Sequence, residues 1–316
     1  MTYLFFLLGF VLLVAGAGWL VEGSLRLARR YGVSELVIGL TVVSIGTSLP
    51  ELVVNVFASL GGNAELAIGN ILGSNIANVL LILGVSGAIR ALPIRDRTIL
   101  SEIPICLAAT LLVGFLANAS LFGSGPLTIS RTDGLILIGF FGLFLGYVYR
   151  TAQDGVIEEP AVGYDGTTAG VLVRVAGGVL ALALGGEWVV RGALEIVASL
   201  GVSESLVGLT VVAVGTSLPE LAASAAAAYR GKADIAVGNV IGSNIFNLLW
   251  VLGVSALIQP LPFDVLSNTD LVVVVASSAL LILAMAVGRP NTVERWEGWL
   301  FLAVYAAYLA FVGARG

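Results

Sequence analysis

Apolar segments follow one another along the whole chain, separated by short polar turns. Most are about 20 residues long, which is the length that an α-helix needs to cross the hydrocarbon core of a bilayer. The pattern predicts ten transmembrane helices and no separate soluble domain. They are expected near residues 3–24, 33–60, 64–89, 99–118, 134–149, 170–198, 202–229, 233–258, 269–287 and 296–313.

Basic residues gather in alternate connections between these segments, twelve on one side and three on the other. Loops rich in arginine and lysine stay in the cytoplasm. The first side holds Arg26, Arg29, Arg30, Arg90, Arg95, Arg97, Arg150, Arg174, Arg230, Lys232, Arg289 and Arg295, and the second holds Arg131, Arg191 and Arg315. The bias predicts a multi-pass protein of the plasma membrane with both termini outside. No basic residue precedes the first apolar run, so no cleavable signal peptide is expected.

The chain matches itself at a shift of 169 residues. Residues 32–52 (GVSELVIGLTVVSIGTSLPEL) and 201–221 (GVSESLVGLTVVAVGTSLPEL) are identical at 16 of 21 positions. Residues 69–84 (GNILGSNIANVLLILG) and 238–253 (GNVIGSNIFNLLWVLG) are identical at ten of 16. Five spans per half is an odd number, so the second copy must enter the membrane from the opposite side. Inverted repeats of this kind are typical of secondary transporters.

These observations predict an all-α integral membrane protein of ten transmembrane helices, arranged as two inverted five-helix repeats. The first repeat is expected over residues 1–149 and the second over 170–316, joined by a cytoplasmic linker at 150–169. The linker is polar and is interpreted as a solvated connection, with a regulatory cation site as the alternative.

Composition agrees with a membrane protein and excludes several classes of function. Of the 316 residues, 58% are hydrophobic and 11% are charged, whereas a soluble domain has about a quarter charged. A net charge of −5 argues against nucleic-acid binding. The chain has no histidine, which excludes histidine metal sites and proton relays, and its single cysteine, Cys106, cannot form an intramolecular disulfide. No Walker motif is present, so ATP is not expected to drive transport.

Two glutamates stand out because they fall in the middle of apolar spans. Glu51 and Glu220 occupy the same position of the repeated GTSLPEL segment. A charged side chain at this depth is costly and marks a functional site by default. Neither span carries an arginine or lysine near the same depth. A mobile cation is therefore the expected counter-charge, and a protonated glutamate bonded to a neighbouring helix is the alternative.

Further oxygen atoms accompany each glutamate. Pro50 and Pro219 interrupt the helices and free carbonyl groups, and hydroxyls lie at the same break. In the repeated GNxxGSNxxN segment a serine and an asparagine four residues apart share one helix face. The polar side chains meant here are Thr47, Ser48, Thr216 and Ser217 at the breaks, and Ser74, Asn78, Ser243 and Asn247 on the faces. The remaining motif residues (Gly69, Asn70, Asn75, Gly238, Asn239 and Asn244) are interpreted as helix-packing and interhelical hydrogen-bonding positions.

The ligand set contains only oxygen, which suits hard cations such as Na⁺ and Ca²⁺ and disfavours zinc and copper. Two carboxylates balance one Ca²⁺ or two Na⁺. At these segments the chain resembles the sodium/calcium exchanger family, and its five-plus-five topology is similar to that of the compact prokaryotic members. The resemblance implies a Na⁺/Ca²⁺ antiporter that works by alternating access, is not an enzyme, needs no cofactor or ATP, and functions as a monomer in the lipid bilayer.

The resemblance also implies roles for particular residues. Glu51 and Glu220 would bridge the bound ions at a site formed by the second, third, seventh and eighth spans. The remaining metal ligands would be Thr47, Thr216, Ser74, Ser243, Asn78 and Asn247, with backbone carbonyls of Ser44 and Ala213. The first and sixth spans would form a sliding gate, and Gly9, Gly16, Gly18, Gly177, Gly178 and Gly185 suit that role.

Other functions stay open at this point. Some relatives carry aspartate where this chain has Asn247, and its absence argues against potassium co-transport. A Ca²⁺/H⁺ antiporter has a similar topology but usually a different motif. A passive cation channel would also use carboxylates in the membrane, although inverted repeats with broken helices favour a carrier. A membrane scaffold without transport would leave the duplicated glutamates unexplained.

Overall fold

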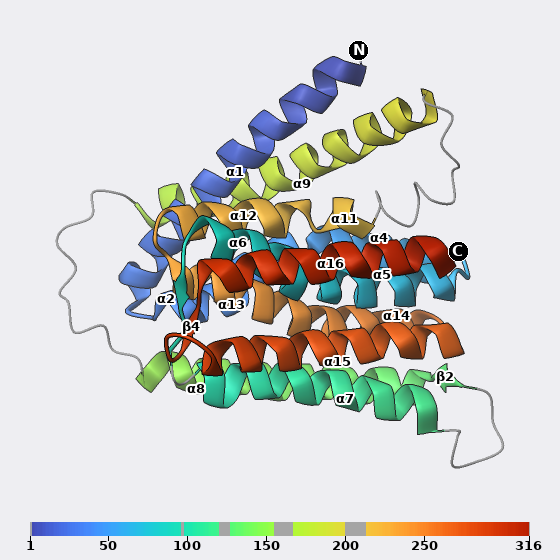
Figure 1. Ribbon diagram of the computed structural model, residues 1–316. Helices are drawn as coiled ribbons and strands as arrows, with labels where there is room; N and C mark the ends of the chain where they lie inside the picture. The colour runs from blue at the N-terminus through green and yellow to red at the C-terminus, as the bar shows by residue number, and fades with distance from the viewer. Residues whose placement is uncertain (1, 96–97, 120–126, 155–166, 200–212, 316) are drawn as a thin grey trace.

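The computed structural model describes residues 2–95, 98–119, 127–154, 167–199 and 213–315. Within these residues eight helices are long and apolar enough to cross a membrane, and one bent pair brings the number to nine. The expected seventh span, 202–229, lies partly outside the described residues. The long uninterrupted helices are α1 (Thr2–Tyr31), α7 (Ile103–Asn118), α8 (Arg131–Asp154), α9 (Thr168–Ser199), α15 (Val265–Ala286) and α16 (Arg295–Arg315). The chain is therefore a multi-pass helical membrane protein, as predicted (Figure 1).

The second span is broken in its middle. It consists of α2 (Glu35–Ile38), the π-helical turn η1 (Gly39–Val43), α3 (Ser44–Thr47) and α4 (Leu49–Leu60). The two parts meet at Ser48 with a bend of 46°. Pro50 at the start of α4 explains the break, because proline has no amide hydrogen and clashes with the preceding turn. The same break separates α11 (Ala213–Thr216) from α12 (Leu218–Tyr229), where Pro219 takes the equivalent place.

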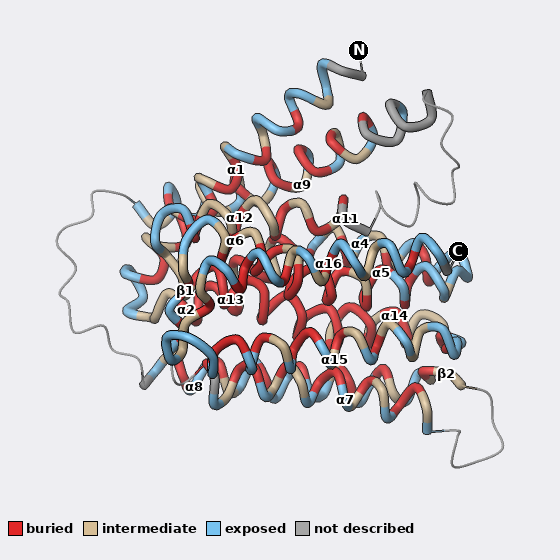
Figure 2. Tube along the Cα trace, viewed as in Figure 1, coloured by how far each residue is buried: buried red, intermediate tan, exposed pale blue. Residues whose placement is uncertain are grey.

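The third and eighth spans form the centre of the molecule. The third comprises α5 (Ala64–Ile76), the π-helical η2 (Ala77–Ile82) and α6 (Leu83–Ile89), and the eighth comprises α13 (Ala233–Ile245), the π-helical η6 (Phe246–Val251) and α14 (Leu252–Ile258). Both keep their predicted limits. In each, 78% of the most apolar window is buried, compared with 28% in α8 and α16. Figure 2 shows this buried zone running through the middle of the bundle, with exposed residues on the outer helices.

Two short strand pairs, which the sequence did not predict, join the two halves of the chain. Strand β1 (Leu92–Pro93) pairs antiparallel with β4 (Thr292–Val293), and β2 (Thr128–Ile129) pairs antiparallel with β3 (Leu261–Pro262). A further π-helical turn, η3 (Thr98–Glu102), precedes α7. Each strand pair therefore closes a loop of one half against a loop of the other.

Helices α1 and α9 lie side by side and cross the rest of the bundle at a steep angle (Figure 1). Their backbones touch at glycines. A β-carbon on Gly9 would lie 2.9 Å from the carbonyl oxygen of Gly185, and one on Gly16 would lie 2.9 Å from that of Gly178. Four of the six glycines predicted for a gating pair thus form its contact. Of the other two, Gly18 faces Arg230 and Gly177 lies near Trp19.

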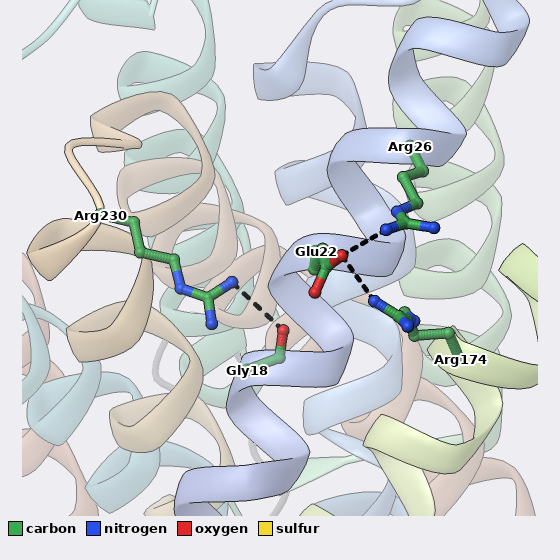
Figure 3. Close-up of polar contacts among 5 residues, drawn as sticks. All are labelled: Gly18, Glu22, Arg26, Arg174 and Arg230. Atoms are coloured by element: carbon green, nitrogen blue, oxygen red, sulfur yellow. Dashed lines mark hydrogen bonds and ion pairs between the residues drawn. The ribbon is translucent and has the colours of Figure 1, made fainter. Parts of the chain in front are cut away.

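A polar cluster ties these two helices together near the C-terminal end of α1 (Figure 3). The Glu22 carboxylate pairs with Arg26 on the same helix and with Arg174 on α9, each at 2.5 Å. Arg230, in the turn after α12, donates to the carbonyl oxygen of Gly18 at 3.3 Å. The side chains are partly exposed, so each ion pair contributes little on its own. Together they fix where α1 meets α9 and α12.

Candidate ion-binding site

The two helix breaks bring both mid-membrane glutamates to the centre of the bundle. Glu51 lies in the first turn of α4 and Glu220 in the first turn of α12, and each is only 1% exposed. The N-terminus of a helix carries a partial positive charge from its free amide groups, which favours a carboxylate there. The breaks therefore supply part of the stabilisation that a buried glutamate needs.

Serines at the breaks connect each glutamate to the opposite half of the chain. The Ser48 hydroxyl donates to Oε1 of Glu220 at 2.7 Å and also lies 2.9 Å from Oγ of Ser243. The Ser217 hydroxyl donates to Oε1 of Glu51 at 3.5 Å. The first half thus holds the carboxylate of the second half, and the reverse. One oxygen of each carboxylate is occupied in this way.

Asparagines from the third and eighth spans form a second cross-connection. Asn78 Nδ2 donates to Oδ1 of Asn244 at 2.9 Å, and Asn247 Nδ2 donates to Oδ1 of Asn75 at 3.2 Å. Asn75 and Asn244 donate in turn to each other's backbone carbonyls, at 3.3 and 3.5 Å. These bonds use the donor ends of the Asn78 and Asn247 amides and leave their oxygens available. The interhelical role predicted for Asn75 and Asn244 is confirmed.

Five buried oxygen atoms of predicted ligands accept no hydrogen bond from the described residues. They are Oε2 of Glu51, Oε2 of Glu220, Oγ of Ser74, Oδ1 of Asn78 and Oδ1 of Asn247. Each residue is at most 1% exposed. Carboxylate and amide oxygens can only accept, so a buried one without a donor costs about 1–3 kcal/mol. A hard cation is the partner that such a set of oxygens fits.

The other predicted ligands lie around the same breaks. Thr47 ends α3 and is 1% exposed, and Thr216 ends α11 and is half-buried. Ser44 is fully buried, and its carbonyl lies 3.5 Å from Oγ of Ser243. Ala213 begins α11, and its side chain lies outside the described residues. All ten predicted residues therefore belong to the broken spans or to the two central spans, and their role as ligands remains a prediction.

Ser48 and Ser217 were missing from the predicted ligand set. The sequence carried a signal for them, because both are hydroxyl residues at the proline break and recur in both repeats. The sequence could not indicate how the two halves lie against each other. That arrangement places each serine next to the glutamate of the other half. In the part of the chain that the structure describes, no three residues among histidine, cysteine, aspartate and glutamate cluster together. Among these described residues, Glu51 and Glu220 are the acidic side chains at the centre.

The fold and this centre define a membrane transporter of cations rather than an enzyme. A family model described as "Sodium/calcium exchanger protein" matches residues 1–150 and 170–314. The chain belongs to the sodium/calcium exchanger family.

Similar proteins match over nearly the full length. Sodium/calcium exchanger MaX1 of Methanosarcina acetivorans is 32% identical over 347 residues, covering 98% of this chain and 97% of the relative. Inner membrane protein YrbG of Escherichia coli is 34% identical over 315 residues, covering 97% and 95%. A solved structure of the sodium-calcium exchanger NCX_Mj superposes with a TM-score of 0.81 at 37% identity, covering 98% of this chain and 99% of that one.

Proposed function

We propose that the protein is a secondary active antiporter that exchanges Na⁺ for Ca²⁺ by alternating access around a central site with two glutamates, Glu51 and Glu220. The observation that carries the proposal is the set of five buried oxygens without a donor, two on the glutamates at the helix breaks and three on the two central spans. One cation among them satisfies several acceptors at once. The solved structures of NCX_Mj include crystals soaked with Na⁺ together with Ca²⁺ or Sr²⁺, and all three are hard cations.

Charge explains why such a site exchanges ions rather than leaking them. Two carboxylates supply two negative charges, which one Ca²⁺ or two Na⁺ neutralise. To switch an empty site from one side of the membrane to the other, the protein would have to keep two negative carboxylates without a cation in a medium of low polarity. This is costly. The carrier therefore moves when loaded with either ion, and the inward passage of one is coupled to the outward passage of the other.

The finer topology belongs to the same proposal. We infer ten spans as two inverted repeats, residues 1–149 and 170–316, with the linker 150–169 in the cytoplasm. The equivalent breaks at Ser48 and Ser217 support this, as does the gap in the family match between residues 150 and 170. The positive-inside count supports an orientation with both termini on the outer side, and we propose the plasma membrane as its location. The protein acts as a monomer and requires no cofactor.

Flux measurements test the function directly. Purified protein in proteoliposomes loaded with Na⁺ is expected to take up Ca²⁺ when the outside is free of Na⁺, and to stop when the Na⁺ gradient is abolished. A parallel arm applies a pH gradient without Na⁺, and another applies neither gradient. Uptake driven by pH alone would replace the proposal with a Ca²⁺/H⁺ antiporter. Rapid flux that needs no counter-ion would replace it with a channel.

Neutral substitutions test the two-glutamate site. Glu51→Gln and Glu220→Gln keep the side-chain shape but remove the charge, so each is expected to reduce exchange to the background of empty liposomes. Both variants should still purify as folded protein, because an uncharged amide is easier to bury than a carboxylate. Exchange retained by either variant would remove that residue from the site. Glu65→Gln is a matched control, since Glu65 is exposed at the start of α5.

A further inference from the structure

We propose that Asn239 and Asn70 are positioning residues that turn the hydroxyls of Thr47 and Thr216 into cation ligands. The inference rests on the proposed function, since it assigns how that site's threonines are prepared. A hydroxyl binds a cation through its lone pairs, so its single proton must be directed elsewhere. Each asparagine accepts a hydrogen bond from the hydroxyl of the threonine in the opposite half, and this bond directs the proton away from the cation.

The contacts on the Thr47 side show the arrangement. The Thr47 hydroxyl donates to Oδ1 of Asn239 at 3.1 Å, and both residues are buried. Nδ2 of Asn239 donates to Oγ of Ser224 at 2.9 Å and to the backbone carbonyl of Glu220 at 3.4 Å. A carbonyl oxygen can only accept, so the amide nitrogen must face it. This fixes Oδ1 toward Thr47.

The equivalent contacts on the Thr216 side reach the same result by a longer route. The Thr216 hydroxyl donates to Oδ1 of Asn70 at 3.3 Å, and Nδ2 of Asn70 donates to Oδ1 of Asn55 at 2.7 Å. Nδ2 of Asn55 donates to the Ala67 carbonyl at 3.0 Å. Because that carbonyl only accepts, the amide nitrogen of Asn55 must face it, and Oδ1 of Asn55 therefore faces Asn70. The amide nitrogen of Asn70 must then point to Asn55, which leaves Oδ1 of Asn70 facing Thr216. Two independent relays therefore present an acceptor to the two threonines.

The alternative acceptor shows why the relay matters to the site. The Thr47 hydroxyl also makes a longer hydrogen bond to the backbone carbonyl of Ser44, at 3.3 Å. Without Asn239, the proton of Thr47 has this carbonyl as its remaining acceptor among the hydrogen bonds of its own helix. The Ser44 carbonyl is itself a predicted ion ligand, so the bond would occupy an oxygen that the cation needs. Loss of Asn239 therefore affects two ligands through one hydroxyl.

A double-mutant cycle separates positioning from a general structural role. Binding of Ca²⁺ alone and of Na⁺ alone is measured on the purified full-length protein by isothermal titration calorimetry. Asn239→Leu is expected to weaken affinity roughly two- to tenfold, the range that one buried hydrogen bond provides. Thr47→Val removes the hydroxyl and keeps the backbone carbonyl. In that background, Asn239→Leu should cause no further loss, because its effect passes through the missing hydroxyl. Thr47→Ser keeps the hydroxyl and should keep the full effect.

The second relay and a distant pair serve as controls. Asn70→Leu with Thr216→Val repeats the cycle independently, in case Asn239→Leu does not fold. Asn268→Leu breaks a half-buried pair of amide bonds with Asn118, at 2.8 and 2.9 Å, and should leave affinity within about twofold of wild type. If the double mutant of each cycle loses affinity by the product of the two single-mutant losses, the inference is overturned and the proposed function stays intact. A wild-type protein that binds neither ion would overturn both.

Discussion

At the scale of residues, the two carboxylates of the centre are held unequally. Glu220 accepts from Ser48 at 2.7 Å, and Ser48 also contacts Ser243. Glu51 accepts from Ser217 at 3.5 Å, which is a weak bond. Hydrogen bonds to an ionised group are the stronger class, so the difference in length carries a difference in energy.

Alanine substitutions should reveal this inequality. In buffer free of Na⁺ and Ca²⁺, Ser48→Ala removes the hydroxyl that donates to Oε1 of Glu220 and is expected to destabilise the protein by about 1–3 kcal/mol. Ser217→Ala should destabilise the protein less, because the hydrogen bond that it removes, at 3.5 Å, is weaker. Thermal unfolding of both variants in detergent measures the difference. Added Ca²⁺ should narrow it, since the ion binds the released oxygen. Equal shifts in Tm for the two variants would contradict the unequal bonding.

Much of the candidate site could be predicted from local sequence. Glu51 was identified because a charge in an apolar run is costly, and Pro50, the fifth residue of the GTSLPEL motif, marks the break. Asn78 was identified because it lies four residues after Ser74, on the same helix face. Contacts such as Ser48 with Glu220 and Thr47 with Asn239 could not be predicted. They depend on how two segments far apart in the sequence lie against each other, and periodicity within one helix carries no information on that.

At the scale of elements, the close packing of α1 on α9 depends on the absence of side chains. A β-carbon on Gly16 would lie 2.9 Å from Cβ of Ala181 as well as from the Gly178 carbonyl. In a membrane, helices associate through such close backbone approach, because there is no hydrophobic force between them. The glycine seam therefore holds the two helices together as one unit.

A bulky residue in the seam should separate the pair. Gly16→Leu is expected to destabilise the protein by about 1–3 kcal/mol through overpacking and to lower the rate of exchange. Gly142→Leu is the matched control, because Gly142 lies on an exposed face of α8 with nothing within 4 Å of an added β-carbon. It should change stability by less than about 0.5 kcal/mol. Equal exchange and Tm in the two variants would show that the seam is not needed.

Element limits were predicted best where a polar or glycine turn adjoins the span on each side. The third and eighth spans kept their limits of 64–89 and 233–258. The fifth was predicted as 134–149, but α8 runs from Arg131 to Asp154, because a helix continues past its apolar part while its polar ends remain in water. The π-helical turns η2 and η6 and the four strands were not predicted, since hydropathy does not distinguish turn types or pair two-residue strands.

At the scale of the whole molecule, the inversion of the two halves can be tested at their matching turns. Asn63 and Lys232 occupy equivalent positions, just before α5 and α13. In a background without the buried Cys106, cysteines placed at these two positions should react from opposite sides of the membrane. A membrane-impermeant maleimide applied to intact cells should label Asn63→Cys and not Lys232→Cys, which should react only after the cells are opened. Labelling of both from outside would contradict an inverted repeat.

The overall arrangement was predictable because the repeat, the odd number of spans and the bias of basic residues point the same way. The sequence could not indicate how the halves lock together. That information lies in the strand pairs and in the serine and asparagine contacts between halves, each of which joins residues separated by well over a hundred positions. Such long-range contacts leave no periodic trace in the sequence.

The strand pairs also determine when during synthesis the protein can mature. Leu92 and Pro93 leave the ribosome early, but their partners Thr292 and Val293 are made about 200 residues later. The N-terminal half of a nascent chain is available to fold first. Here strand β1 of that half stays unpaired until residues 292 and 293 have been made. A chain that stops short of residue 292 therefore leaves strand β1 of the first half without its partner in the second half.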